Sequence, residues 1–100
     1  MDTPLIEHLP DRSRFVIRLG KETIGTAYYR EEDGRRAFTH TEVDPDYQGH
    51  GLASQLIERA LNDTRDAGLR IVALCPMVSA YVAKHHDWDE LLDSSDVSPS

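Results

Sequence analysis

The chain has 100 residues, 39% hydrophobic and 29% charged, which is typical of one globular domain and not of a disordered chain. No apolar run approaches the roughly 20 residues of a membrane span, and residues 1–11 lack the basic region and apolar core of a signal peptide, so we expect neither. The formal net charge of −7 argues against general nucleic-acid binding, because neutralising phosphates needs a basic surface.

The first half of the chain predicts three strands joined by short turns. Residues 14–19 alternate between polar and apolar side chains, and residues 23–30 are rich in β-forming types. Asp33-Gly34, a strong hairpin signal, then leads into a third strand over residues 36–43.

The second half predicts a helix, a strand and a second helix. Apolar residues recur at helical spacing over residues 52–67, and Gly68 supplies the C-terminal stop. Residues 69–75 form an apolar run that predicts a buried strand beside the third one, and Pro76 opens a helix through His85.

These elements predict an α/β (α+β) fold in the order β-β-β-α-β-α, with helices packed on a mostly antiparallel mixed sheet. We expect one domain over residues 14–92, preceded by an N-terminal segment, residues 1–13. Residues 93–100 are acidic and serine-rich, and we expect them to form a disordered tail.

The turn between the third strand and the first helix is the most informative segment. Its backbone N–H groups converge at a helix N-terminus, and two glycines let a bulky anion approach the main chain. A pyrophosphate is the natural occupant. The turn lacks the third glycine of a dinucleotide fingerprint and the Gly-Lys-Ser/Thr of a P-loop.

Gln48-x-x-Gly51-x-Ala53 resembles the Q/R-x-x-G-x-G/A signature of the GNAT superfamily of acyl-CoA-dependent N-acetyltransferases. The likeness is closest to the very short stand-alone branch of that superfamily and runs from about Phe15 to Leu92. It rests also on the segments His40-Thr41-Glu42-Val43 and Leu74-Cys75-Pro76 and on the residues Tyr81 and His85.

The resemblance implies a site for acetyl-CoA as co-substrate. The backbone amides that would hold its pyrophosphate belong to Gln48, Gly49, His50, Gly51, Leu52 and Ala53. The main chain at Glu42 and Val43 would pair with the pantetheine arm, and an N–H there would stabilise the thioester oxyanion. The reaction is then attack by a neutral amine on acetyl-CoA, which needs a base for the amine proton and an acid for the thiolate.

Tyr81 is the candidate acid, because similar acetyltransferases carry a tyrosine there that reaches the CoA sulfur; the alternative is a core aromatic with its hydroxyl at the surface. Glu42 and His40, two apart on one strand, are the candidate bases. The alternative for each is an ordinary cross-strand hydrogen bond.

Cys75 is the only cysteine, which excludes an internal disulfide and a cysteine-built zinc site and leads us to expect a cytoplasmic protein. Its thiol precedes a helix N-terminus, so it could be an acetyl-accepting nucleophile, a residue lining the acyl end of the CoA site, or a small core residue. His85 and His86 are adjacent and lack a third ligand, so we expect no metal.

Two functions remain open. The first is an N-acetyltransferase whose amine acceptor belongs to a basic protein or peptide, drawn to the acidic chain. The second is a CoA- or acyl-CoA-binding module with little or no turnover, because few residues remain to build an acceptor pocket.

Overall fold

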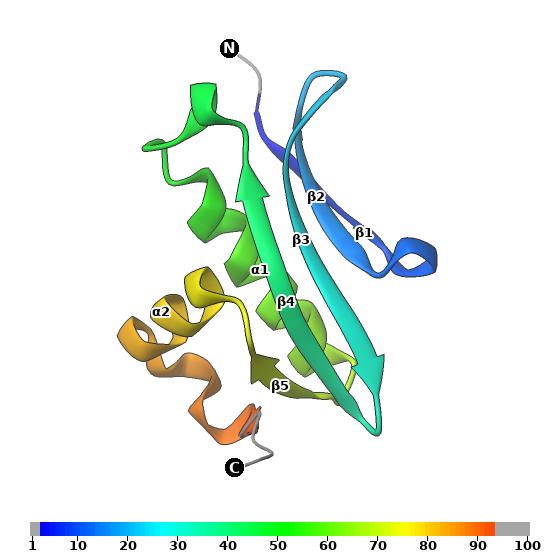
Figure 1. Ribbon diagram of the computed structural model, residues 1–100. Helices are drawn as coiled ribbons and strands as arrows, with labels where there is room; N and C mark the ends of the chain where they lie inside the picture. The colour runs from blue at the N-terminus through cyan, green and yellow to red at the C-terminus, as the bar shows by residue number, and fades with distance from the viewer. Residues whose placement is uncertain (1–2, 94–100) are drawn as a thin grey trace.

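The computed structural model describes residues 3–93 as one mixed sheet with both α-helices on the same side (Figure 1). In chain order the elements are β1 (Leu5–Leu9), a 3-10 turn (Pro10–Arg12), β2 (Arg14–Leu19), β3 (Glu22–Glu32), β4 (Arg35–Val43), a 3-10 turn (Pro45–Tyr47), α1 (Leu52–Asp66), β5 (Arg70–Ala73), α2 (Pro76–Lys84), a 3-10 helix (His86–Leu91) and β6 (Leu92–Asp93). None of the helices in this part of the chain is long and apolar enough to cross a membrane.

The sheet has the strand order β1-β2-β3-β4-β5-β6. The strands β1 to β4 pair antiparallel with one another in order, whereas β5 runs parallel to β4 and β6 runs parallel to β5. The predicted mostly antiparallel mixed sheet is therefore confirmed. The predicted order omitted two strands, β1 and β6. Both are short, five and two residues, and they exist because a neighbouring strand pairs with them, which a local pattern does not reveal.

The described residues extend the sheet beyond the predicted domain at both ends. Residues 5–9, which we assigned to the N-terminal segment, pair with β2 along their whole length. Asp93, which we assigned to the tail, pairs with Val72 in β5. The rest of the predicted disordered tail, residues 94–100, lies outside the described residues.

The β3–β4 hairpin follows the Asp-Gly signal in the sequence. Asp33 and Gly34 have φ angles of 56° and 75°, and two successive positive φ values match the type I′ turn, whose twist suits paired strands. Because this hairpin sets the pairing of β4, it also positions the residues that follow along that strand.

One extra residue in β4, Thr39, reverses which side chains face the helices. Tyr28 pairs with His40 while the next residue, Tyr29, pairs with Phe38, so Thr39 has no partner in β3. A bulge of this kind shifts the two-residue alternation by one. Phe38 and Thr41 are therefore both buried, and His40 is exposed.

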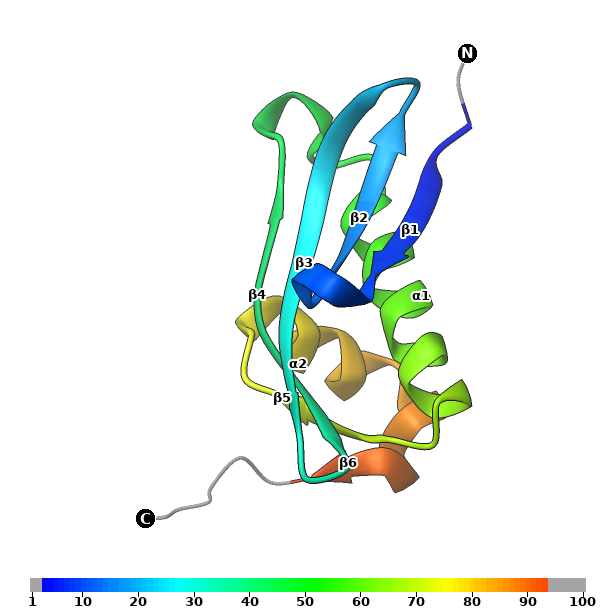
Figure 2. The ribbon, with the colours of Figure 1, turned by 90° about the vertical axis from the view of Figure 1, so that its right-hand side faces the viewer.

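The two faces of the sheet are covered unequally. Helix α1 buries Leu56, Ile57, Ala60 and Leu61 on the core, as its apolar spacing predicts. Turned by 90°, the structure has α1 along one side of the sheet (Figure 2). Val78 and Val82 of α2 are buried in the same core cluster as the α1 side chains, so both α-helices lie on this side.

A polar cluster ties β1 to the rest of the core. The His8 ring stacks on Phe15 with centroids 4.1 Å apart, and its Nε2 lies 2.6 Å from the Tyr29 hydroxyl. The buried Arg36 guanidinium lies 4.6 Å from the Tyr29 ring centroid and donates a hydrogen bond to Glu31. Burial, and next the charge of Arg36, lowers the pKa of His8 below its usual 6.5, against the opposing effect of Asp63.

This lowered pKa predicts acid sensitivity. The folded protein favours neutral His8, so its stabilisation is present above pH 6.5 and is lost as the pH falls through the lower folded-state pKa. We expect His8→Phe, which keeps the stacking on Phe15, to lose less stability than wild type between pH 7 and pH 5. Urea unfolding at several pH values measures this difference. Identical pH dependence in the two proteins would contradict it.

Candidate functional site

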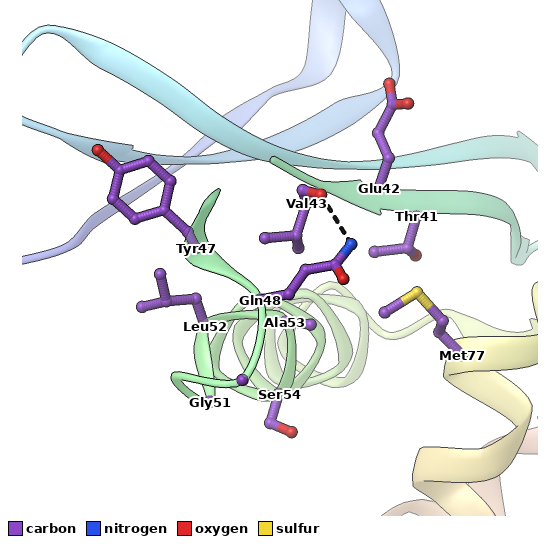
Figure 3. A pocket seen from close by; sticks show the side chains of 11 residues that line it. Thr41, Glu42, Val43, Tyr47, Gln48, Gly51, Leu52, Ala53, Ser54 and Met77 are labelled. Atoms are coloured by element: carbon purple, nitrogen blue, oxygen red, sulfur yellow. Dashed lines mark hydrogen bonds between the residues drawn. The ribbon is translucent and has the colours of Figure 1, made fainter. Parts of the chain in front are cut away.

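The site begins where β5 leaves β4. β5 pairs only with residues 35–38 of β4, and the amides of Leu74 and Cys75 both donate to the Phe38 carbonyl, at 3.1 and 2.8 Å. Beyond Phe38, no described strand pairs with this edge of β4. The Val43 carbonyl faces that open edge, where it accepts a hydrogen bond of 3.3 Å from the Gln48 side chain (Figure 3). Because alternate residues of a strand point their backbone groups to the same side, the main chain of Thr41 faces the open edge too.

The glycine turn meets this open edge. Gly49 and Gly51 have φ angles of 86° and 74°, a conformation that favours glycine. A methyl group placed on either glycine would meet no atom within 4 Å, so the space above both is open.

Helix α1 begins directly after this turn with unpaired donors. Its first helical bond runs from the Gln55 amide to the Gly51 carbonyl, and no side chain caps the helix. The amides of Leu52, Ala53 and Ser54 therefore have no partner within the helix, and the positive end of the helix dipole lies behind them. An anion fits this place.

The strand edge and the turn together line a pocket of about 530 Å³, which we call the main pocket (Figure 3). Its lining residues are Thr41, Glu42, Val43, Tyr47, Gln48, Gly49, Gly51, Leu52, Ala53, Ser54 and Met77. A second pocket of about 370 Å³, the side pocket, shares Ala53, Ser54 and Met77 and extends towards Tyr81 and Lys84. The two pockets therefore meet between the first turns of α1 and α2.

Six of the seven predicted cofactor-binding residues line the main pocket, namely Val43, Gln48, Gly49, Gly51, Leu52 and Ala53. The seventh, His50, lines a separate pocket with Tyr47 and Gln55.

Sequence reasoning missed four of the lining residues, namely Thr41, Tyr47, Ser54 and Met77. Ser54 follows the signature directly, so its position at the helix N-terminus could have been predicted. Met77 is a large apolar side chain with 40% of its surface exposed, and only the fold brings it to the pocket.

Tyr81 lines the side pocket, not the main one. Its ring contacts His85, with centroids 4.4 Å apart, and is half-buried. Burial raises the pKa of Tyr81 above its usual 10, with smaller contributions from Glu58 and Asp87. The hydroxyl therefore keeps its proton at neutral pH and is a weaker proton donor than a free tyrosine.

Cys75 lies in the core. It is 2% exposed, lines neither pocket, and its Sγ lies 3.4 Å from the Thr41 hydroxyl. The thiol thus contacts a residue of the main pocket wall from behind.

Glu42 and His40 lie on the other side of β4. In Figure 3 the Glu42 side chain points away from the main pocket, while Thr41 and Val43 point into it. The Glu42 carboxylate accepts a hydrogen bond of 3.0 Å from the Tyr28 hydroxyl, and His40 Nε2 lies 3.7 Å from its other oxygen. The structure thus brings the two predicted bases together, on the face of the sheet without an α-helix.

Among residues 3–93, no three His, Cys, Asp or Glu side chains lie close enough together to hold a metal ion.

The family model of the GCN5-related N-acetyltransferases matches residues 14–91. The chain belongs to this family. No curated protein matches it by sequence. The resemblance stated from the signature is therefore confirmed at the level of the family.

Solved structures share the fold of this family member. A GCN5-like protein from Staphylococcus aureus is 18% identical, with a TM-score of 0.70 over 92% of this chain and 90% of that one. A ribosomal-protein-alanine N-acetyltransferase from Brucella melitensis biovar Abortus 2308 is 21% identical, with a TM-score of 0.54 over 87% and 65%. The ribosomal-protein-S18-alanine N-acetyltransferase of Escherichia coli is 22% identical, with a TM-score of 0.56 over 58% of this chain and 38% of that one. This chain therefore corresponds to only part of the larger enzymes.

The burial of Cys75 predicts a thiol that is protected in the folded state. We expect iodoacetamide to modify it at least about tenfold more slowly in the native protein than in urea, because only an exposed thiolate reacts. Mass spectrometry over time gives both rates. Equal rates would mean that the thiol is accessible and would revive its role as a nucleophile.

Proposed function

We propose that the protein is an N-acetyltransferase that moves the acetyl group of acetyl-CoA to an amine by direct attack. The main support is the continuity of two features, an anion site at the α1 N-terminus and an unpaired strand edge at β4. Coenzyme A combines a pyrophosphate with an extended arm that carries amide groups. An anion site joined to a free strand edge suits a molecule with both parts.

In this proposal the pyrophosphate binds the turn and the first amides of α1, from Gly49 to Ser54. The pantetheine arm lies along β4, where the backbone at Thr41 and Val43 offers hydrogen bonds. The Gln48 side chain now bonded to the Val43 carbonyl would move aside or bridge to the arm. Met77 and Ala53 would pack against the apolar parts of the arm.

The chemical step needs two proton transfers. The amine nitrogen attacks the thioester carbon, a backbone N–H of β4 stabilises the oxyanion, and the carbon–sulfur bond then breaks. Glu42 or His40 accepts the amine proton, and Tyr81 donates its proton to the departing thiolate. Tyr81 is protonated at neutral pH, as the acid must be, although its raised pKa makes it a weaker proton donor than a free tyrosine. The buried Cys75 plays no covalent part in this scheme.

The alternative, a CoA- or acyl-CoA-binding module with little turnover, has one observation in its favour. Neither α-helix covers the face of the sheet that carries Glu42 and His40, so an acceptor bound there would contact few residues. Both functions require CoA binding, and only an enzyme transfers the acetyl group. We propose a cytoplasmic enzyme acting on a protein or peptide amine, towards which the net charge of −7 draws a basic partner.

A charge placed at the helix N-terminus tests the CoA site. Ser54 is exposed and lines the main pocket, so Ser54→Asp sets a carboxylate against the bound pyrophosphate. We expect CoA to bind roughly tenfold more weakly or worse, the effect of a like-charge contact of a kcal/mol or more. Calorimetric titration with CoA gives the affinities.

The matched control is Gln55→Asp, which adds the same charge to the same turn but does not line the main pocket. Both variants should stay folded, because an acidic residue near a helix N-terminus is stabilising. Unchanged CoA affinity in Ser54→Asp would remove the basis for the site.

The acid role of Tyr81 is tested by removing its hydroxyl. We expect Tyr81→Phe to lower kcat by about 10²-fold, at the low end of the range for general acid–base catalysis, while acetyl-CoA still binds. Cys75→Ala should in contrast retain transfer, because direct attack forms no acyl-cysteine. Steady-state assays of acetyl transfer give both values. Full activity in Tyr81→Phe would remove its role as the acid. Loss of activity in Cys75→Ala, together with an acetylated Cys75 in wild type, would overturn direct attack.

A further inference from the structure

Four side chains gather on the face of the sheet that no α-helix covers. They form what we call the outer cluster, made up of Arg14, Tyr28, His40 and Glu42. Tyr28 is paired with Arg14 on one neighbouring strand and with His40 on the other, so the three stand in one cross-strand row. Glu42 occupies the next row on the same face, opposite Thr26.

Tyr28 is held from both sides. The Arg14 guanidinium carbon lies 4.9 Å from the centroid of its ring, and the His40 ring is stacked 5.9 Å away with an interplanar angle of 20°. A ring clamped in this way keeps its hydroxyl in one direction. That hydroxyl donates to Glu42 Oε2 at 3.0 Å. Tyr28 therefore fixes the orientation of the carboxylate.

Glu42 differs from Glu7, Glu31 and Asp93, the carboxylates of the sheet that pair with an arginine. Glu7 pairs with Arg18 and Glu31 with Arg36, whereas Glu42 has only His40 and Tyr28 as partners within residues 3–93. Its side chain is 58% exposed. An exposed carboxylate without a lysine or arginine partner attracts a cation from solution.

Glu42 also lies where two pockets meet. It lines the main pocket although its side chain points away from that pocket, and it lines a further pocket of about 240 Å³ together with Thr26 and Asp44. The free edge of β4 separates the carboxylate from the main pocket, so a group bound at Glu42 is one strand away from a thioester bound there.

We propose that the outer cluster is the acceptor subsite, that it takes a primary amine on an unbranched arm such as a lysine side chain, and that Tyr28 is its positioning residue. The proposal rests on the function proposed above. Acetyl-CoA enters from the helix side, and the amine enters from the open face. An unbranched arm is slender enough to reach past the free edge of β4. The α-amine of a chain terminus is attached to a carbon that also carries a side chain and a carbonyl, so it is too bulky to reach as far. The open face leaves room for the protein that bears the lysine.

Tyr28→Phe tests the positioning role because it keeps the ring between Arg14 and His40 and removes only the hydroxyl. We expect kcat to fall roughly tenfold, the order of one hydrogen bond to a charged group, with KM for acetyl-CoA and the unfolding midpoint nearly unchanged. If the hydrogen bond between Tyr28 and Glu42 were purely structural, Tyr28→Phe would instead lower the unfolding midpoint and leave kcat unchanged. In a Glu42→Gln background, adding Tyr28→Phe should change kcat little, because Tyr28 acts through Glu42.

The matched control is Tyr29→Phe. It makes the same chemical change at the adjacent residue, whose hydroxyl lies on the other face beside His8. We expect Tyr29→Phe to lower the free energy of unfolding and to leave kcat unchanged at temperatures below its unfolding transition.

Two peptides of equal charge test the acceptor class. One carries a single lysine and a blocked N-terminus, and the other carries a free N-terminus and no lysine. We expect the lysine peptide to be acetylated with the higher kcat/KM, and a preference for the α-amine would overturn the proposal. Transfer by wild type and Tyr28→Phe at equal kcat would refute the acceptor subsite and leave the proposed function standing. Binding of acetyl-CoA without transfer to either peptide would refute both.

Discussion

The separation of β5 from β4 after Phe38 is the constraint on which the rest of the site depends. Two successive amides, those of Leu74 and Cys75, share the Phe38 carbonyl, and Pro76 then begins α2. Proline has no N–H with which to continue the ladder, and its fixed φ suits the first turn of a helix. The chain therefore turns away from β4 and leaves the main chain at Thr41 and Val43 open. Unpaired strand edges attract extended partners, and here the glycine turn and the α1 N-terminus stand beside the opening.

The bulge at Thr39 distributes chemistry between the two faces of β4. Without the extra residue, Phe38, His40 and Glu42 would share one face, and two polar side chains would lie under the helices. With it, Thr41 closes the main pocket from the helix side and His40 and Glu42 emerge on the open face. One irregular residue thus separates the proposed donor site from the proposed acceptor subsite by the thickness of a single strand.

The opposite end of the sheet is held firmly. Arg36 is 4% exposed, donates to Thr64 and Glu31, and lies over the Tyr29 ring. His8 adds β1 to the same cluster through Phe15 and Tyr29. Groups around an active site act best when rigid elements support them. In so small a chain, this buried polar network and the hairpin at Asp33-Gly34 anchor β3 and β4 at the end remote from the open edge.

The sequence by itself determined the local elements, including the glycine turn of the proposed anion site. The Asp33-Gly34 turn, the apolar spacing of α1 and the two glycines before it act within a few residues, so they predicted the hairpin, the helix and the open turn at the helix N-terminus. The tertiary structure decided what depends on distant pairing. It added β1 and β6, buried Cys75 behind Thr41, brought Met77 to the main pocket and turned Glu42 to the open face beside Tyr28. Sequence spacing alone could not reveal these placements, because a bulge, a strand partner and a shared wall arise only when segments far apart in the chain come together.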